Sequence, residues 1–169
     1  MRDTNKQSWT RYSRRRPRRS YIKAMPHQDI NQFRMGTIKP DYDVTYNLVS
    51  EQDIQIRDNA LESSRQAINK YLEKTMLGNF YFVVRVFPHQ VIRENKMIAG
   101  AGADRLQKGM RQSFGRATDK AARVKKNQEV LTISTYKNKD LFIQAAVSRA
   151  RKKLPGFYKL VKLVVESPI

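Results

Sequence analysis

Most of the side chains that could do chemistry in this sequence are cations, and two segments are especially rich in them. Residues 93–116 contain four glycines and have a net charge of 6 − 2 = +4, with cations at Arg93, Lys96, Arg105, Lys108, Arg111 and Arg116. Glycine has no Cβ, so backbone at these positions can come close to a partner. Strand-like runs flank the segment, and a loop that a scaffold holds at both ends is well placed to carry function. The pattern predicts a basic loop that reaches toward an anionic partner.

The second segment is an N-terminal arm, residues 1–25, that is rich in arginine. Residues 1–20 carry eight cations and one acid, which gives +7, and the six cations of positions 11–19 are all arginine. Guanidinium groups form two hydrogen bonds to one phosphate and stack on bases, and tyrosine rings also stack on bases. This composition therefore favours binding to structured RNA. The alternative interpretation is a localisation signal or a solvated tail. The predicted contacts are Arg11, Arg14, Arg15, Arg16, Arg18, Arg19, Tyr21 and Lys23.

The charge of the whole chain indicates the same class of partner. The 169 residues carry 34 Lys and Arg against 15 Asp and Glu, a formal net charge of +19. Self-repulsion at this level opposes a compact state unless a partner neutralises it, and nucleic acid offers about one phosphate charge per 1.7 Å of duplex. An anionic membrane is the other candidate, but no apolar run approaches the roughly 18–20 residues of a spanning helix. We therefore expect no membrane association.

The composition predicts one folded domain. Apolar residues make up 40% of the chain, which suffices for one modest core. We expect residues 26–169 to form a single domain from which a loop, residues 93–120, protrudes. The arm has too little apolar surface to fold alone and should become ordered on its partner. The chain has no Cys, which excludes disulfides and thiolate metal sites and fits a reducing cytosol.

No enzymatic motif is complete in the sequence. Residues 100–104 begin like a dinucleotide-binding fingerprint, but Arg105 stands where the third glycine is required. The order of residues 108–110, Lys-Gly-Met, is not that of a phosphate-binding P-loop, and two His without Cys cannot supply a standard zinc site. We predict no catalytic residue, no metal and no cofactor. Two alternatives stay open: a nucleic-acid enzyme that uses Asp104 with His89, and a free-standing DNA-binding or architectural protein.

Hydrophobic periodicity predicts the scaffold that must position these segments. Alternating or β-branched runs predict strands at residues 44–49, 80–87, 91–92, 121–126, 129–136 and 158–166. Apolar residues at helical spacing predict helices at residues 58–75 and 141–154. We expect strands 121–126 and 129–136 to pair as a hairpin, and residues 25–40 to form an irregular connector. The predicted fold is α+β, a two-layer sandwich of a mostly antiparallel sheet with two helices, to which the basic arm and the long basic loop are added.

Capping residues predict where the helices begin and end. Asn59 with Glu62 reads as a capping box, Gly78 as the stop of the first helix, and Asp140 as the cap of the second. Arg65 is expected on the solvated side of the first helix. Cations in the last turn of the second helix complement its dipole, and contact with RNA explains them equally well. The packed side of the second helix is predicted to contain Phe142, Ala145, Ala146, Arg149 and Ala150.

Several stretches of the sequence match a known family. They are the run of residues 85–115, Ala122-Arg123-Val124, Arg16-Pro17-Arg18 with Tyr21, and Asn69-Lys70-Tyr71 in the first predicted helix. On these residues the chain strongly resembles the universal large-subunit ribosomal protein family, called L-sixteen in bacteria and L-ten-e in archaea and eukaryotes. The likeness runs from about residue 14 to residue 165. The absence of Cys and of a long C-terminal extension is more similar to archaeal members.

The resemblance implies a fold, a function and a set of partners. Members of this family have an α/β sandwich and bind large-subunit rRNA between the central protuberance and the base of the factor-binding stalk. Their long basic loop points toward the peptidyl-transferase region and the tRNA acceptor ends. The chain would then be a cytoplasmic ribosomal protein and not an enzyme, with rRNA, tRNA and neighbouring ribosomal proteins as partners. Besides the arm, the residues expected to bind rRNA are Arg93, Lys96, Arg123 and Lys125, and those expected on the loop toward tRNA are Arg105, Lys108, Arg111 and Arg116.

Overall fold

A computed structural model of the chain describes residues 25–96, 100–101 and 115–164. The arm up to residue 24, most of the central loop and residues 165–169 lie outside the described residues. What the sequence predicts for those segments therefore stays a prediction.

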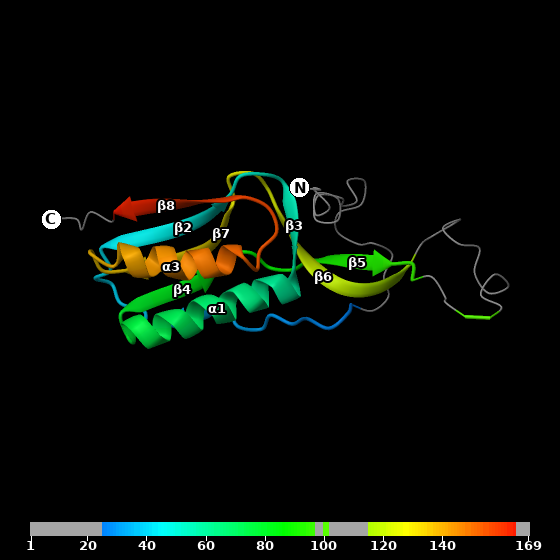
Figure 1. Cartoon of the computed structure of the whole chain (residues 1–169), viewed down its shortest axis with the longest axis horizontal. Coiled ribbons are helices and arrows are strands. Elements are labelled where there is room, and N and C mark those ends of the chain that lie inside the picture. Colours follow the sequence, from blue (N-terminus) through cyan, green and yellow to red (C-terminus); the bar gives the residue numbers. More distant parts are fainter. Residues whose placement is uncertain (1–24, 97–99, 102–114, 165–169) are drawn as a thin grey trace.

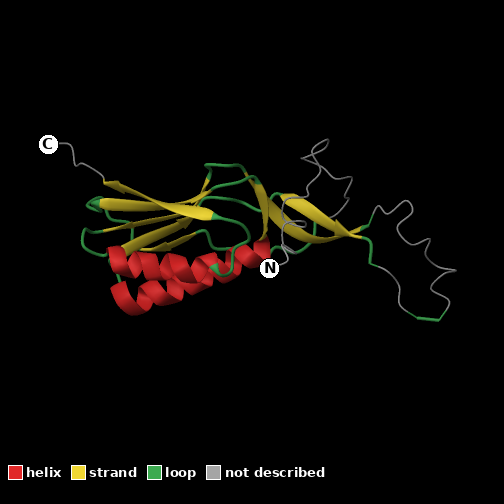
Figure 2. Cartoon of the chain, turned by 45° about the horizontal axis from the view of Figure 1, so that its top comes forward, coloured by secondary structure: helices red, strands yellow, loops and turns green. Residues whose placement is uncertain are grey.

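The larger part of the fold is a two-layer sandwich. Its sheet has five antiparallel strands in the order β1 (Arg34–Gly36), β4 (Phe80–Val84), β7 (Glu129–Thr135), β2 (Val44–Ser50) and β8 (Tyr158–Val164). The helices α1 (Asp58–Met76) and α3 (Asp140–Arg151) pack against each other and lie on the same side of this sheet (Figure 2). The predicted α+β fold with two helices is thus confirmed for the described part of the chain.

A second, smaller sheet continues the molecule away from the sandwich. Its three antiparallel strands are β3 (Ile54–Arg57), β6 (Arg116–Val124) and β5 (Gln90–Glu94), with β6 in the middle. Figure 1 shows β5 and β6 extending beyond the helices as a narrow projection. The predicted strand at residues 91–92 is therefore the centre of β5.

The core forms where the inward side of the five-stranded sheet meets the helices. Successive strand residues point to opposite faces, and the inward set of β2 and β4 is almost fully buried: Val44, Tyr46, Leu48, Phe80, Phe82 and Val84. From α1, the apolar residues Leu61, Ile68 and Leu72 are buried beneath them. α1 ends at Met76, two residues before Gly78, whose φ of 72° confirms the predicted stop.

The predicted hairpin between β6 and β7 is wrong. A turn at residues 125–128 joins these strands, but β6 pairs with β3 and β5, whereas β7 pairs with β2 and β4. The turn is tied to the end of β2, because Asn127 N donates to Ser50 O (2.8 Å). The apolar residues of β6 lie opposite Ile54 and Ile56 of β3, so burial of this face, and not proximity in sequence, decides the pairing.

Two short strands were not predicted, and one predicted strand is shorter. β1 falls within the predicted connector at residues 25–40, and β3 has two polar residues among its four. Runs of three or four residues give too little periodicity to stand out from a loop. The strand predicted at residues 80–87 ends at Val84; Val86 is still buried, whereas Arg85 and Phe87 are exposed.

Neither predicted side-chain cap forms. The N-cap residues are Arg57 for α1 and Lys139 for α3, and neither makes a side-chain cap bond. Asp140 is the first residue of α3, and its carboxylate accepts the Tyr46 hydroxyl and Lys162 Nζ, which ties α3 to β2 and β8. Lys162, with help from Tyr46, holds the pKa of Asp140 below its usual range.

The packed side of α3 also differs from the prediction. Its buried residues are Ile143, Ala146, Val147 and Ala150, while Phe142 and Arg149 are exposed. Both sets fit helical spacing. The observed set turns the branched aliphatic side chains inward, in place of an aromatic ring and a guanidinium group.

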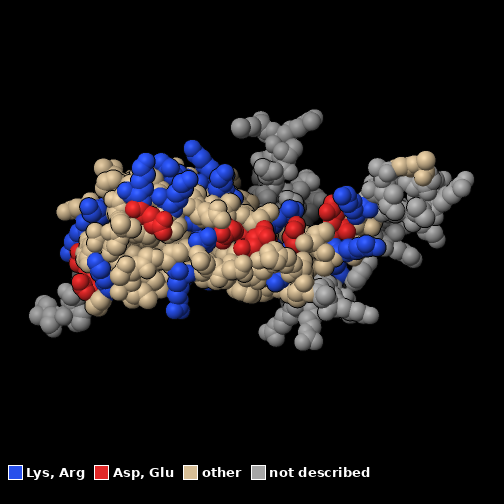
Figure 3. Space-filling model, turned by 90° about the horizontal axis from the view of Figure 1, so that it is seen from below, with Lys and Arg blue, Asp and Glu red and all other residues tan. Residues whose placement is uncertain are grey.

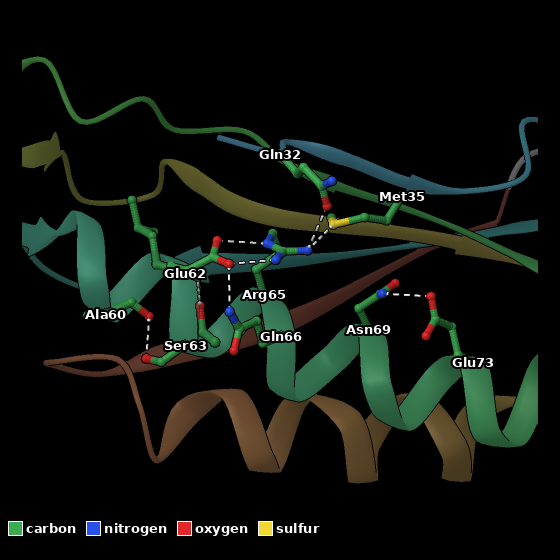
Figure 4. A network of polar contacts seen from close by, with 11 residues as sticks. Gln32, Met35, Ala60, Glu62, Ser63, Arg65, Gln66, Asn69 and Glu73 are labelled. Carbon is green, nitrogen blue, oxygen red and sulfur yellow. Dashed lines mark hydrogen bonds and ion pairs between the residues drawn. The ribbon is translucent and has the colours of Figure 1, made fainter. Parts of the chain in front are cut away.

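A covered ion pair joins α1 to β1 and to the segment before it. The Glu62 carboxylate accepts bonds from Arg65 Nη2 (2.5 Å), from Arg65 Nε (2.8 Å) and from Gln66 Nε2 (2.8 Å). Arg65 Nη1 also donates to Gln32 Oε1 (3.3 Å) and to Met35 Sδ (3.2 Å) (Figure 4). The side chains of Arg65 and Glu62 are 12% and 18% exposed, so the expectation of a solvated Arg65 is wrong. The hydrogen bonds from Arg65 lower the pKa of Glu62.

We expect Glu62→Gln to lower the free energy of unfolding at pH 7 by about 1–2 kcal/mol, because a mostly covered guanidinium group loses its carboxylate. The matched control is Glu73→Gln on the exposed side of the same helix, where Asn69 Nδ2 donates to the carboxylate (2.8 Å). This control should change stability by less than about 0.5 kcal/mol. Urea unfolding followed by circular dichroism measures both variants, and equal stabilities would contradict the expectation.

The same substitution should change the response to acid. Because the folded chain lowers the pKa of Glu62, the pair's contribution to stability is present above the usual glutamate pKa and is lost as the pH falls through the lower folded value. From about pH 4.5 to about pH 3, the urea midpoint of the native chain should therefore fall more steeply than that of Glu62→Gln. Parallel declines would show that the pair does not couple to folding.

Candidate nucleic-acid interface

β5 and β6 form a two-stranded ribbon that leaves the body of the protein. β6 pairs with β3 through residues 121–124, whereas its residues 116–120 have β5 as their strand partner. An isolated two-stranded ribbon is at best marginally stable in water. The root of the ribbon, where β6 passes at Ala121 from its pairing with β5 to its pairing with β3, therefore holds the projection that Figure 1 shows.

A bulge lies near the free end of the ribbon. The register shifts between Ile92 and Arg93, and Thr118 is the extra residue on the opposite strand. The Thr118 hydroxyl donates to Ile92 O (3.2 Å). A bulge increases the local twist and turns the side chains beyond it to new directions. Past this bulge, Arg93 lies opposite Ala117.

Three of the predicted RNA-binding cations come together at the tip of the ribbon. Arg93 is in β5, Lys96 follows two residues after that strand, and Arg116 begins β6. Glu94 lies opposite Arg116, so the tip carries 3 − 1 = +2. Figure 3 shows Lys and Arg side chains, with acidic ones among them, at this narrow end of the molecule. A local surplus of positive charge on a thin projection attracts a polyanion from several directions.

Gly115 closes the neck from which the central loop emerges. Its φ of 71° lies in the left-handed region, and a Cβ at this position would lie 2.8 Å from the carbonyl carbon of Glu94 and 3.0 Å from Asn95 N. A glycine is required for the backbones to approach this closely. The two ends of the loop, at residues 95 and 115, are therefore held side by side at the tip.

Charged residues at the root of the ribbon have partners inside the protein. Arg57 Nη1 lies 3.6 Å from Asp119 Oδ2, and Lys120 Nζ donates to Gln28 Oε1 (3.3 Å). These contacts brace β6 against β3 and against the segment before β1. Sequence reasoning missed Arg57 and Lys120; the polar run that precedes Ala121 held too few apolar residues to be assigned to a strand.

The other two described candidates, Arg123 and Lys125, lie at the opposite end of β6. Arg123 is opposite Gln55 in β3. Lys125 is exposed in the turn to β7, where its backbone N donates to Gln128 Oε1 (2.9 Å). At about 3.3 Å per residue, Lys125 is roughly 30 Å along the strand from Arg116. The predicted site is thus divided into a tip group, which consists of Arg93, Lys96 and Arg116, and a root group, which consists of Arg123 and Lys125.

The cations at the end of α3 have two roles. The Arg149 guanidinium lies over the Tyr71 ring of α1, 4.3 Å from its centroid, and so joins the two helices. Arg151, Lys152 and Lys153 are exposed at the C-terminus of α3, where they complement the helix dipole and face solvent. The structure therefore separates Arg149 from the rest of this cluster.

The remaining candidates lie outside the described residues. They are Arg11, Arg14, Arg15, Arg16, Arg18, Arg19, Tyr21 and Lys23 of the arm and Arg105, Lys108 and Arg111 of the loop.

The described ranges offer no metal centre and no membrane span. Residues 25–96, 100–101 and 115–164 hold no group of three or more His, Cys, Asp or Glu side chains that could bind a metal ion. No helix within the same ranges is long and apolar enough to cross a bilayer. His89 Nδ1 lies 3.0 Å from Phe87 O, a hydrogen bond that fixes the ring at the corner between β4 and β5.

Comparison with known proteins gives a consistent result. The family model described as ribosomal protein L16p/L10e matches residues 9–161. The large ribosomal subunit protein uL16 of Methanococcus maripaludis (strain C7) is 44% identical over 161 residues, which are 95% of this chain and 89% of the relative. The proteins of the same name from Staphylothermus marinus and Hyperthermus butylicus are 47% and 46% identical over 139 residues, 82% of this chain and 80% and 77% of the relatives.

The matched residues include both helices, the whole three-stranded sheet and the cations at the tip and root of the ribbon. The relatives named above come from archaea, in agreement with the archaeal character predicted from the sequence. The chain belongs to the L16p/L10e family of ribosomal proteins.

Proposed function

We propose that this chain is a structural constituent of the large ribosomal subunit that binds large-subunit rRNA and helps to position tRNA acceptor ends near the peptidyl-transferase region. One observation carries the proposal: the ribbon holds Arg93, Lys96 and Arg116 together at its free end, away from the body of the protein. A firm projection with surplus positive charge suits RNA that folds around it.

Membership of a family of ribosomal proteins confirms the predicted structural role in the cytoplasmic ribosome, as opposed to an enzymatic one. It also removes support from the two alternatives, a nucleic-acid enzyme and a free-standing DNA-binding protein. The hydrogen bond of His89 to Phe87 O agrees with a positioning role for that ring. The protein's contribution to peptide synthesis is then to hold RNA in place while the RNA does the chemistry.

The contacts divide by position along the chain. The tip group contacts rRNA phosphates around the projection, and the root group, Arg123 and Lys125, contacts a separate rRNA segment beside the sandwich. The arm makes hydrogen bonds and ion pairs to rRNA phosphates and stacks on bases. The residues that do so are Arg11, Arg14, Arg15, Arg16, Arg18, Arg19, Tyr21 and Lys23. Neighbouring ribosomal proteins contact the remaining surface of the domain, residues 26–169.

The loop carries the tRNA part of the proposal. Gly115 holds both ends of the loop at the tip of the ribbon, so the loop starts from a fixed point. Its cations Arg105, Lys108, Arg111 and Arg116 reduce the repulsion between rRNA phosphates and the incoming tRNA acceptor end. Crosslinks from Arg105 and Arg111 to tRNA in intact ribosomes are the direct test of this part.

Removal of the tip charges should weaken rRNA binding. We expect the triple variant Arg93→Gln, Lys96→Gln, Arg116→Gln to bind isolated large-subunit rRNA about 10- to 100-fold more weakly near 0.15 M salt, and to lower the slope of log K against log salt by about 2–3. Filter binding of the full-length chain over a KCl series measures both quantities.

The matched control removes three charges from the opposite end of the sandwich, Lys39→Gln, Lys74→Gln, Lys137→Gln. It should leave the slope nearly unchanged, because these positions are far from the ribbon. If both triple variants lose affinity equally, net charge alone drives binding and the tip has no special role.

Gly115→Ala should reduce rRNA affinity through the geometry of the neck. The added Cβ meets the backbone of Glu94, so β5 and β6 must separate at the tip and the ordered start of the loop is lost. We expect a loss of about 3- to 10-fold in affinity, since preorganisation of a binding segment lowers the cost of association.

Gly78→Ala is the control for this variant. Gly78 also has a positive φ (72°), but a Cβ there meets nothing within 4 Å. It should cost about 1 kcal/mol of stability and leave rRNA affinity unchanged. Filter binding and urea unfolding together separate the two effects, and unchanged binding by Gly115→Ala would refute the role of the neck.

A further inference from the structure

The outward face of the five-stranded sheet is uncovered in the described part of the chain. Both helices lie on the other side, over the residues that form the core (Figure 2). The register places Val83, Thr132, Asn47 and Val161 in one row across strands β4, β7, β2 and β8. A second row contains Tyr81, Ser134, Thr45 and Leu163. We call these two rows the outer face.

The outer face is uncharged in a chain whose net charge is +19. None of the eight side chains in its two rows is ionisable near neutral pH, and Leu163 is 48% exposed. Clusters of exposed cations lie elsewhere, at the tip of the ribbon, in the turn after β6 and at the end of α3. Such a neutral, partly apolar area is unlike the surfaces that bind nucleic acid through phosphates.

Polar atoms at the centre of the outer face lack partners. Asn47 is 4% exposed; its Nδ2 donates to Glu129 Oε1 (2.6 Å), but its Oδ1 accepts no hydrogen bond. The Thr132 hydroxyl, opposite Asn47 on β7, is also without a partner. Buried polar groups are normally paired, so these two nearly inaccessible atoms leave hydrogen-bonding capacity unused at the centre of the sheet.

Charged residues appear at the rim of the outer face. Arg34 on β1 and Lys159 on β8 are exposed at the two edges of the sheet, and Arg85 Nη2 pairs with Glu129 Oε2 (3.2 Å) at one end. The rim therefore carries 3 − 1 = +2. An uncharged centre within a polar rim is the anatomy of a protein–protein interface, and the surplus at the rim suits carboxylates on the partner.

RNA is the less suitable occupant of this surface. Binding of single-stranded RNA to a sheet needs exposed aromatic rings for stacking and cations along the backbone path. The two rows contain one aromatic ring, that of Tyr81, which is half-buried, and the cation that continues the first row, Arg34, lies on β1 at the edge of the sheet. β8 also leaves one edge open for backbone hydrogen bonds, because it pairs with β2 alone among the described strands.

We infer that the outer face docks a neighbouring protein of the large ribosomal subunit. That protein presents small apolar side chains and hydrogen-bonding groups to the two rows, and carboxylates to Arg34 and Lys159. The inference rests on the proposed function for the place of this chain in the large subunit. It adds a surface and a class of partner that rRNA binding does not require.

The experiment places the photocrosslinker p-benzoylphenylalanine at Leu163 in one full-length variant and at Arg116 in another, each assembled into large subunits. After irradiation, digestion with ribonuclease or protease identifies the crosslinked species, and mass spectrometry identifies the crosslinked peptide. We expect the probe at position 163 to crosslink one large-subunit protein, and the probe at position 116 to crosslink rRNA. Crosslinks from position 163 to rRNA, to a second copy of this chain or to nothing would overturn the inference.

The two probes also separate this inference from the proposed function. If position 116 fails to reach rRNA while position 163 still crosslinks a subunit protein, the rRNA proposal fails and the docking surface stands. If position 116 crosslinks rRNA but position 163 crosslinks no subunit protein, the docking surface is refuted and the rRNA proposal stands.

The charged rim is tested by a second measurement. Arg34→Glu with Lys159→Glu should be released from large subunits at roughly half the salt concentration that releases the native chain. The matched pair Lys70→Glu with Lys74→Glu makes the same change in net charge at exposed positions of α1, on the other side of the sheet, and should be released at nearly the native concentration. Equal release of the two double variants would overturn the assignment of an acidic partner rim.

Discussion

The structure depends on the double pairing of β6. One half of this strand, residues 121–124, pairs with β3, whereas the other half pairs with β5, and Ala121 has partners on both strands. The first half is anchored because its apolar residues lie against Ile54 and Ile56, which are fully buried. The second half extends a backbone ladder into solvent, where a two-stranded ribbon alone has little stability. The body of the protein therefore anchors one end of the ribbon. The cations at its free end are held in place although the ribbon has no hydrophobic core of its own.

The core could be predicted from periodicity, because strong alternation and long helical spacing report burial directly. The inward residues of β4, such as Phe80 and Phe82, and the apolar side of α1 were found in this way. The pairing of β6 could not be predicted, because a strand at the boundary of two sheets has neighbours that sequence adjacency does not reveal. The predicted capping bonds do not form because other side chains bind the carboxylates: Glu62 accepts from Arg65, three residues later in the same helix, and Asp140 accepts from Lys162 of β8. The predicted start of α1 at residue 58 is confirmed.

The candidate site was only partly predictable from the sequence. The cations of residues 93–116 stand out by composition, and the structure brings Arg93, Lys96 and Arg116 together because β5 and β6 are paired at that point. Arg123 and Lys125 belong to the same strand and its following turn, yet the length of β6 carries them to the other end. Charge can be read from the sequence, but the distance between charges depends on strand register, and a bulge such as that at Thr118 is invisible in composition.

The distribution of charge gives the two surfaces different tasks. If rRNA were the sole partner, a chain with a net charge of +19 would gain affinity from cations on every exposed face, since each phosphate contact adds to binding. The outer face instead has threonine, serine, asparagine and valine where lysine would be tolerated by the half-exposed positions of a sheet. Positive charge beneath a docked protein would be desolvated without a phosphate to neutralise it, which is costly. A neutral sheet beside cationic projections is therefore the arrangement expected of a domain that is held by protein on one side and by RNA at its ends.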